Sequence, residues 1–189
     1  MHSASPSLSD AEIGSIAARI DRPIVLVGLM GVGKSTVGRK LAALLRTDFV
    51  DADEEIETAA AMPITDIFET YGEEYFRDGE RRVIARLLAE GHGVIATGGG
   101  AFVNPETRAL VLSSAIAVWI DCAIDTLVER TSRRDNRPLL KDGDPAEILA
   151  RLHKERSPFY GEAPIRIESQ PGPQHETAYQ IIEAIERWL

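Results

Sequence analysis

The chain of 189 residues, 44% apolar and 27% charged, has the composition of a globular protein and is long enough for one domain with a single core. Its formal net charge of −9 argues against nucleic acid or an anionic membrane surface as a partner. One cysteine permits no internal disulfide and no apolar run reaches about 18 residues, so we expect a cytoplasmic protein that does not enter a membrane.

The first 22 residues form an N-terminal extension that we expect to be partly disordered. Residues 1–8, MHSASPSL, carry no periodic apolar pattern. Ser9 or Asp10 then provides a cap for a short helix from Ala11 to Ile20. The dipeptide Arg22-Pro23 ends this helix, because the residue before a proline avoids the helical conformation.

The segment IVLVGLMGVGKSTVGRKLA, residues 24–42, reads as strand, loop and helix. Its first four residues are the apolar run of a strand buried on both faces of a parallel sheet. The loop fits G-x-x-x-x-G-K-[ST], in which backbone N–H groups and the positive end of a helix surround phosphate. Lys34 is expected to reach the β- and γ-phosphates, and Ser35 to hold Mg²⁺. The expected contacts to ATP in this loop are Gly28, Gly31, Val32, Gly33, Lys34, Ser35 and Thr36.

Strands and helices alternate along the rest of the chain. Further strands are expected at 48–51, within GHGVIATGGG (91–100), at 115–120 and at 165–169. Helices are expected around Ile56, over 63–72 with Gly72 at the end, and over 73–90, 104–113, 124–133, 145–156 and 174–189. This alternation predicts an α/β protein with the three-layer P-loop NTPase fold, about five parallel strands with helices on both faces. The charged, proline- and glycine-containing segment 131–145 is expected to be a mobile lid.

Acidic residues follow the strand at 48–51. Ligands of parallel sheets bind beyond the carboxyl ends of the strands, where Asp51-Ala-Asp53 is expected to lie. On an extended strand end, Asp51 and Asp53 would point to one face. Two carboxylates repel a triphosphate unless a metal lies between, so Asp51 is expected to be the Mg²⁺ partner through water. Asp53 is then the partner of an acceptor hydroxyl and a candidate general base; the alternative is that both are solvated loop acids or helix caps.

Six short motifs occur together in a family-specific order. They are the P-loop, FVDAD (49–53), FR..E (76–80), ATGGG (96–100), RPLL (137–140) and R...Y (156–160). Over residues 23–175 the chain resembles shikimate kinase. The resemblance implies one kinase domain over residues 23–189 that acts in aromatic amino acid biosynthesis, and we expect a monomer. It also implies a reaction in which the γ-phosphoryl group of ATP, with Mg²⁺, passes to the 3-hydroxyl of shikimate.

The resemblance assigns roles that spacing alone does not. Arg77 and Glu80 lie three residues apart on a helix, where an exposed ion pair is the plain interpretation. The family instead places an arginine for the substrate carboxylate at Arg77 and a second one at Arg156. A carboxylate favours such two-pronged guanidinium binding over lysine. Glu80 would hold Arg77 and contact a ring hydroxyl, and the resemblance adds substrate contacts from Gly98, Gly99 and Gly100.

The basic residues near the lid are expected to serve ATP. Arg130 matches a position that stacks on adenine, and Arg137 matches the lid arginine whose charge supports phosphoryl transfer. In an unrelated protein, such a charge-rich loop would simply be solvated. The GTPase motif N-K-x-D is absent from the sequence. Two alternatives stay open: another P-loop small-molecule kinase, for gluconate or a nucleoside monophosphate, and a nucleotide-binding protein without catalysis.

Overall fold

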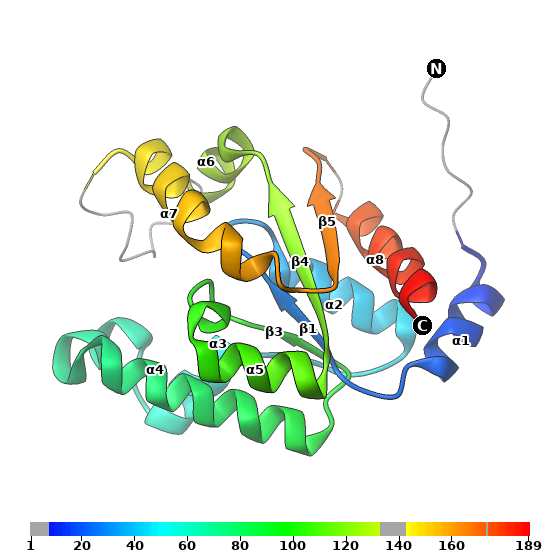
Figure 1. The fold of residues 1–189 in the computed structure, drawn as a ribbon, viewed down its shortest axis with the longest axis horizontal. Helices are drawn as coiled ribbons and strands as arrows, with labels where there is room; N and C mark the ends of the chain where they lie inside the picture. The colour runs from blue at the N-terminus through cyan, green and yellow to red at the C-terminus, as the bar shows by residue number, and fades with distance from the viewer. Residues whose placement is uncertain (1–7, 133–142, 173) are drawn as a thin grey trace.

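The computed structural model describes residues 8–132, 143–172 and 174–189. Its centre is a five-stranded sheet in the order β2-β3-β1-β4-β5, in which every pair of neighbouring strands is parallel (Figure 1). The strands are β1 (Ile24–Val27), β2 (Phe49–Asp51), β3 (Val94–Ala96), β4 (Ile116–Cys122) and β5 (Ile165–Ser169). The predicted α/β class and the parallel sheet of five strands are confirmed.

The burial of the strands follows their position in the sheet. β1 and β4 lie inside the sheet and are buried along their whole length. β5 lies at an edge and alternates buried with exposed residues, so Arg166 and Glu168 face outward. A strand covered on both faces requires an almost continuous apolar run, which is the pattern that the sequence shows at both central strands.

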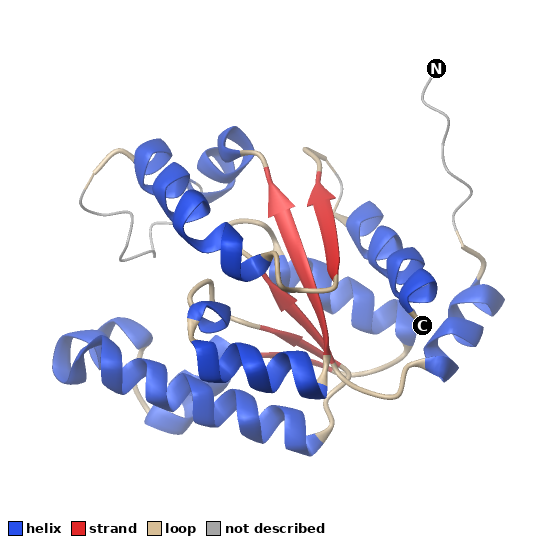
Figure 2. Cartoon of the chain, viewed as in Figure 1, coloured by secondary structure: helices blue, strands red, loops and turns tan. Residues whose placement is uncertain are grey.

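Helices cover both faces of the sheet (Figure 2). α2 and α8 pack on each other on one face, while α4 and α5 lie on the opposite face, with α5 against β4 (Figure 1). The predicted three layers are therefore confirmed. The helices are α1 (Asp10–Arg19), α2 (Lys34–Leu45), α3 (Ala52–Ala60), α4 (Ile64–Glu90), the 3₁₀ turn η1 (Ala101–Val103), α5 (Pro105–Ser114), α6 (Ile124–Ser132), α7 (Pro145–Tyr160) and α8 (His175–Trp188).

The N-terminal helix α1 belongs to the common core. Ser9 and Glu12 form a capping box at its start, in which each side chain accepts a hydrogen bond from the other residue's backbone N–H. Ile13 and Ile16 on its inner face are buried in the same apolar cluster as the sheet. α1 contacts both α2 and α8, so part of the expected extension covers the face formed by these two helices.

The break in α4 lies at the glycine that the sequence indicates. Gly72 has φ 86° and ψ 173°, a backbone conformation outside the helical region that residues with a Cβ rarely adopt. Residues 64–90 are therefore two helices that join at a kink. The expectation of two helices meeting at Gly72 is confirmed in position, but there is no intervening loop.

The helix predicted over 145–156 is longer than expected. α7 continues for one more turn to Tyr160, although Pro158 lies inside it and supplies no N–H to the helix. The additional turn brings Tyr160 into the core, where only 1% of this residue is exposed. The sequence prediction was therefore wrong at this end, and burial of the tyrosine stabilises the extra turn.

The lid and a membrane-spanning helix are the two remaining expectations about the fold. Most of the predicted lid at 131–145, including Arg137, falls on 133–142 and lies outside the described residues. Within the described ranges, no helix combines the length and the apolar character needed to cross a membrane.

Candidate functional site

The loop after β1 opens directly into the first turn of α2. Gly33 precedes this helix with φ 94°, and a Cβ there would lie 2.5 Å from Nε2 of Gln174. The left-handed backbone conformation therefore favours glycine, and the amide of Gln174 fills the space beside it. Within the described part of the chain, no side chain caps the start of α2. The first N–H groups of the helix are thus available to an anion, as phosphate binding requires.

Lys34 is the cation of this loop. The residue is 9% exposed, and its Nζ donates to the carbonyl oxygens of Gly28 at 2.5 Å and Leu29 at 3.0 Å. The ammonium group is therefore held inside the curve of the loop. This is the location that the sequence motif predicts for a lysine serving phosphate.

Ser35 and Asp51 connect the loop to the end of β2. The Ser35 hydroxyl donates to Oδ2 of Asp51 at 2.6 Å. Oδ1 of Asp51 accepts from the backbone N–H of Asp53 at 2.9 Å and of Glu54 at 3.4 Å, which makes Asp51 the N-cap of α3. Asp51 is thus a helix cap, one of the alternatives left open by the sequence, and it also lies beside Ser35.

Asp53 occupies a different local structure from the one expected. It lies in the first turn of α3 rather than on an extended strand end, so strand alternation does not set its direction. Its Oδ1 lies 2.8 Å from the point that a Cβ on Gly98 would occupy. Burial raises the pKa of Asp53 to about 6, Asp51 adds to the rise, and Lys34 opposes it.

Glu80 is a buried carboxylate on α4. It is 1% exposed, and its Oε1 accepts from Nη1 of Arg77 at 2.9 Å. Its Oε2 is buried, lies 3.3 Å from the Cβ position of Gly98, and has no hydrogen-bond partner among the described residues. Burial raises the pKa of Glu80 to about 7, although Arg77 opposes the rise.

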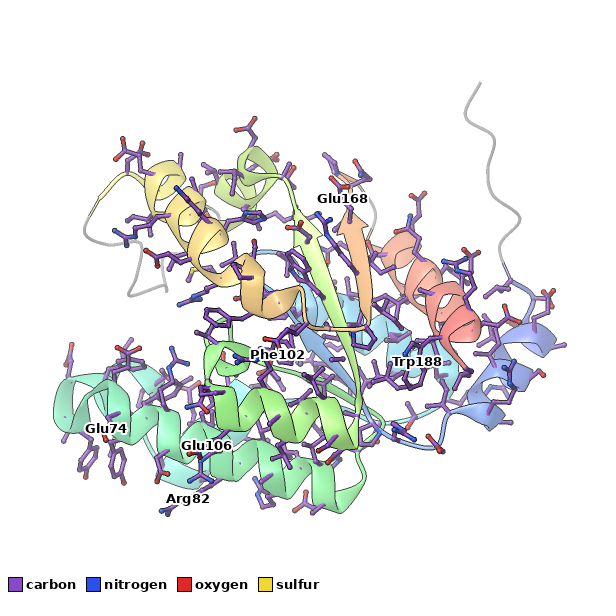
Figure 3. The ribbon with its side chains drawn as sticks, in the orientation of Figure 1. Glu74, Arg82, Phe102, Glu106, Glu168 and Trp188 are labelled. Carbon is purple, nitrogen blue, oxygen red and sulfur yellow. The ribbon has the colours of Figure 1, made fainter. Side chains whose placement is uncertain are left out.

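The Arg77–Glu80 pair is therefore no exposed ion pair, and that interpretation of the spacing is wrong. The contrast with other charged residues of α4 is visible in Figure 3, where Glu74 and Arg82 point away from the body of the protein. Arg77 also has Glu73 at 3.7 Å, but the Glu73 side chain is 71% exposed. Its closer carboxylate is the buried one.

Each glycine of the run at 98–100 faces a charged side chain. A Cβ on Gly98 would meet the carboxylates of Asp53 and Glu80, as described above. A Cβ on Gly99 would lie 3.0 Å from Nη1 of Arg156, and one on Gly100 would collide with the guanidinium of Arg77. The run thus lets two cations and two carboxylates from three helices approach the same short backbone segment.

Arg156 lies on α7, and no paired carboxylate among the residues that the structure describes balances the charge of its guanidinium group. It is half-buried, and no carboxylate among the described residues lies within ion-pair distance of its guanidinium. A half-buried guanidinium of this kind is suited to an anionic ligand.

Arg130 on α6 bridges two segments near the loop. Its guanidinium donates to the carbonyl oxygen of Val32 at 3.1 Å and to that of Gln170 at 3.3 Å. It therefore ties the phosphate loop to the chain leaving β5. Arg137, the expected lid arginine, lies outside the described residues, so its position adds nothing to this geometry.

Sequence reasoning gave no role to Tyr160 or to the partner of His153. The Tyr160 hydroxyl donates to the carbonyl oxygen of Gly99. Nε2 of His153 lies 3.0 Å from Oδ1 of Asp121, whose Oδ2 accepts from Arg166 at 2.7 Å. The motif R...Y includes Tyr160 and could have drawn attention to it. The contacts of Asp121 could not be predicted in this way, because they join segments far apart in sequence.

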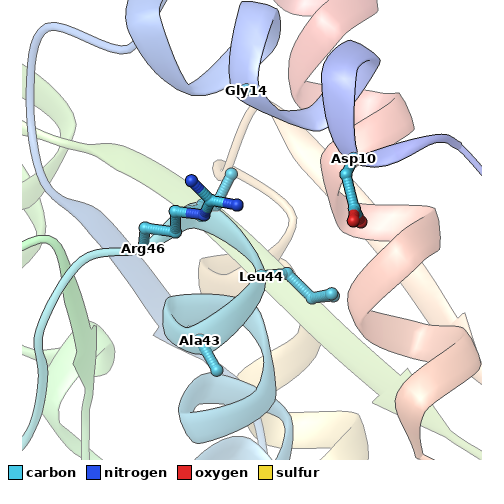
Figure 4. Close-up of a pocket in the computed structure, with 6 residues that line it drawn as sticks. Asp10, Gly14, Ala43, Leu44 and Arg46 are labelled. Atoms are coloured by element: carbon cyan, nitrogen blue, oxygen red, sulfur yellow. The ribbon is translucent and has the colours of Figure 1, made fainter.

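A separate pocket of about 280 Å³ lies between α1 and the end of α2 (Figure 4). Its lining residues are Asp10, Gly14, Ala43, Leu44, Leu45 and Arg46. It is at the end of α2 opposite Lys34 and contains none of the residues predicted for the site. It is therefore not part of the arrangement around the glycine run.

Comparison with known proteins points to one family. The family model described as shikimate kinase matches residues 30–186. A shikimate kinase of Novosphingobium aromaticivorans is 63% identical over 186 residues, which cover 96% of each chain. One from Rhodopseudomonas palustris is 52% identical and matches over 97% of this chain and 89% of its own.

Solved structures give the same result. The shikimate kinase from Acinetobacter baumannii in complex with shikimate matches with a TM-score of 0.86 and 39% identity, over 91% of this chain and 97% of that chain. A gluconokinase from Sinorhizobium meliloti matches with a TM-score of 0.62 and 18% identity, over 90% of this chain and 94% of its own. The second likeness extends to the fold alone.

Proposed function

The chain belongs to the shikimate kinase family, and we propose that it transfers the γ-phosphoryl group of ATP to the 3-hydroxyl of shikimate in aromatic amino acid biosynthesis. One observation carries the proposal. Two arginines and two buried carboxylates meet at the Gly98–Gly100 run, beside a phosphate loop. A protein that only bound nucleotide would need the loop but neither Arg77 nor Arg156.

The two arginines bind the carboxylate of shikimate. Arg77 and Arg156 lie against neighbouring glycines, Gly100 and Gly99, so both guanidinium groups approach the same short stretch of backbone. A planar carboxylate accepts paired hydrogen bonds from a guanidinium, which fixes both its position and its orientation. Glu80 holds Arg77 through Oε1, and its second oxygen is the acceptor for a ring hydroxyl.

Asp53 receives the proton of the reacting hydroxyl. A pKa of about 6 leaves the carboxylate ionised at neutral pH while keeping it basic enough to take a proton as the oxygen attacks phosphorus. Asp53 faces Gly98, while Lys34 contributes to its electrostatic surroundings from the phosphate loop. It thus lies between the groups assigned to the acceptor and those assigned to the donor.

The donor side is formed by the loop and the basic residues around it. Lys34 and the first N–H groups of α2 bind the phosphates, and Arg130 lies beside the adenine. We assign to Arg137 the delivery of a further positive charge when the lid closes. That assignment is based on the motif RPLL alone.

Ser35 and Asp51 are the residues suited to Mg²⁺. Their oxygen atoms lie 2.6 Å apart at the mouth of the loop, and both are of the hard type that Mg²⁺ prefers. An ion held by these two residues would take its other ligands from phosphate oxygens and water. Ser35 and Asp51 would hold Mg²⁺ where its charge could offset that of the β- and γ-phosphates.

We further propose that the enzyme works as a monomer in the cytoplasm. The only cysteine of the sequence, Cys122, is a buried free thiol, which suits a reducing compartment.

The test of the proposed function is ADP release with a panel of acceptors. We expect rapid release with ATP and shikimate, and only background release with gluconate, nucleoside monophosphates or no acceptor. The product with shikimate should carry one phosphoryl group on the 3-hydroxyl by phosphorus NMR. Faster turnover of gluconate or a nucleotide would reassign the acceptor, and release that ignores every acceptor would indicate a simple nucleotide hydrolase.

Arg77→Lys is expected to raise KM for shikimate by roughly 10- to 100-fold. The lysine keeps the charge but loses the paired hydrogen bond, a difference of about 1.5–3 kcal/mol for a bond between charged groups. The carboxylate keeps its charge in the transition state, so kcat should fall less than KM rises. Steady-state kinetics with saturating ATP provides the measurement.

The matched control is Arg82→Lys, a change of the same type on the same helix but on the outward-facing side (Figure 3). It should leave both constants near their original values. If Arg77→Lys behaves like this control, another group binds the carboxylate.

A further inference from the structure

Tyr160 is a buried polar side chain for which neither the sequence nor the proposed reaction supplies a role. The residue is 1% exposed, and its ring packs on Trp119 with centroids 5.9 Å apart. Burial raises the pKa of Tyr160 to about 12, and the neighbouring guanidinium of Arg156 limits the rise. The phenol therefore remains a hydrogen-bond donor throughout the physiological pH range.

The hydroxyl connects α7 to the glycine run. It donates to the carbonyl oxygen of Gly99, the same glycine whose Cβ position lies 3.0 Å from Nη1 of Arg156. Arg156 and Tyr160 are four residues apart on α7 and so lie on one face of the helix. Both side chains thus meet the run at a single residue.

The glycine run needs such an anchor. Three consecutive residues without side chains have wide backbone freedom, and no side chain of their own can fix them in the core. Both guanidinium groups approach neighbouring residues of the run, Arg77 at Gly100 and Arg156 at Gly99. A shift of its backbone would change how both groups meet one carboxylate.

α7 itself is held by other contacts. His153 binds Asp121 of β4 at 3.0 Å, and Glu162, just beyond the helix, binds Nε of Arg108 at 2.7 Å. The Arg108 guanidinium also lies 4.9 Å from the ring centre of Phe159. Removing the single oxygen of Tyr160 should therefore leave the helix in place and affect only its connection to the run.

We propose that Tyr160 is a positioning residue for acceptor binding. Its hydroxyl holds the carbonyl of Gly99 in place, so that Arg156 and Arg77 can both bind the carboxylate of the acceptor. This inference rests on the proposed function, since it assumes that the two arginines bind the acceptor. Tyr160 would act through the backbone of Gly99 rather than by contact with either substrate. The specificity of the site for an anionic acceptor thus depends in part on the neutral hydroxyl of Tyr160, which contacts the glycine run.

The test is Tyr160→Phe, which removes the hydroxyl and keeps the ring that packs on Trp119. We expect KM for shikimate to rise about 5- to 10-fold, the effect of one lost hydrogen bond. KM for ATP and kcat should change less than about twofold, since the phosphate loop and Asp53 are unaffected. Thermal melting reports whether the fold survives.

Tyr179→Phe on α8 is the matched control, because it removes the same oxygen from a half-buried tyrosine away from the glycine run. It should leave all three constants unchanged. An unchanged KM for shikimate in Tyr160→Phe overturns the inference, as does an equal deterioration of kcat and both KM values, which would mark a purely structural role. If the unaltered protein fails to phosphorylate shikimate, both the proposed function and this inference are wrong. If the unaltered protein turns over shikimate and Tyr160→Phe has the same KM, only this inference is wrong.

Discussion

Lys34→Ala is expected to lower kcat by at least about 100-fold with every acceptor. Losing one preorganised electrostatic group from an active site typically has an effect of this size. Lys34 is the buried cation of the phosphate loop, and its ammonium group lies within the curve formed by Gly28 and Leu29. Because the role proposed for Lys34 is to bind phosphate rather than the acceptor, shikimate binding measured by calorimetry should persist in the variant.

Lys40→Ala provides the comparison for this variant. Lys40 lies on the same helix, is exposed, and faces away from the loop. The same loss of charge there should leave kcat unchanged, while circular dichroism confirms that both variants fold. Near-normal turnover in folded Lys34→Ala would show that the loop does not perform phosphoryl transfer.

Asp53→Asn is expected to lower kcat by about 100- to 10,000-fold, the range that a positioned general base contributes. In the unaltered enzyme, kcat/KM should fall as pH falls through about 6, because protonation then removes the base. The variant should show low activity without this acidic limb. A pH-rate profile of both proteins distinguishes Asp53 from Glu80, whose pKa is raised to about 7: a limb that survives in the variant belongs to the glutamate.

The same substitution should stabilise the fold at neutral pH. The pKa of Asp53 is raised on folding, so the folded protein binds this proton more tightly than the unfolded chain does, and the charged form is destabilising. Asparagine is neutral at every pH. The Tm of Asp53→Asn should therefore exceed that of the unaltered protein above pH 6, and the difference should shrink as pH falls from 6 toward 4.

Glu54→Gln is the control for both effects. It makes the same acid-to-amide change one residue further along α3, where the side chain is exposed and pairs only loosely with Arg39 at 3.4 Å. It should alter neither kcat nor the pH dependence of Tm. If Asp53→Asn lowers Tm at neutral pH, the carboxylate is a structural group and not a strained functional one.

The fold could be predicted because its signals are local. The apolar runs of β1 and β4, the glycine loop between β1 and α2, and the capping asparagine of α5 each specify structure through neighbouring residues. Their alternation then fixes the class of sheet. The extent of α7 was predicted less well, since the burial of Tyr160 against Trp119, a contact distant in sequence, extends the helix past Pro158.

The residues of the candidate site could be predicted from the sequence, but their arrangement in space could not. The motifs identified Asp53, Arg77 and Arg156, and the structure brings all three to the glycine run. Sequence could not show that Asp53 sits on a helix, because the residue at which β2 gives way to α3 depends on the cap that Asp51 forms. It also could not show that each glycine accommodates a particular charged group, because these approaches are tertiary contacts.

The order of strands in the sheet has a consequence for synthesis of the chain. β1 is made first, yet its two neighbours come much later: Ile24 pairs with Val94 on one side and with Ile116 on the other. α2, which follows the loop, packs against α8 at the far end of the chain. A chain emerging from the ribosome therefore carries an apolar strand with both edges unpaired over a long stretch of translation, and such edges invite association with other chains. The glycine loop between β1 and α2 is thus among the first segments to be synthesised and among the last to gain its full set of neighbours.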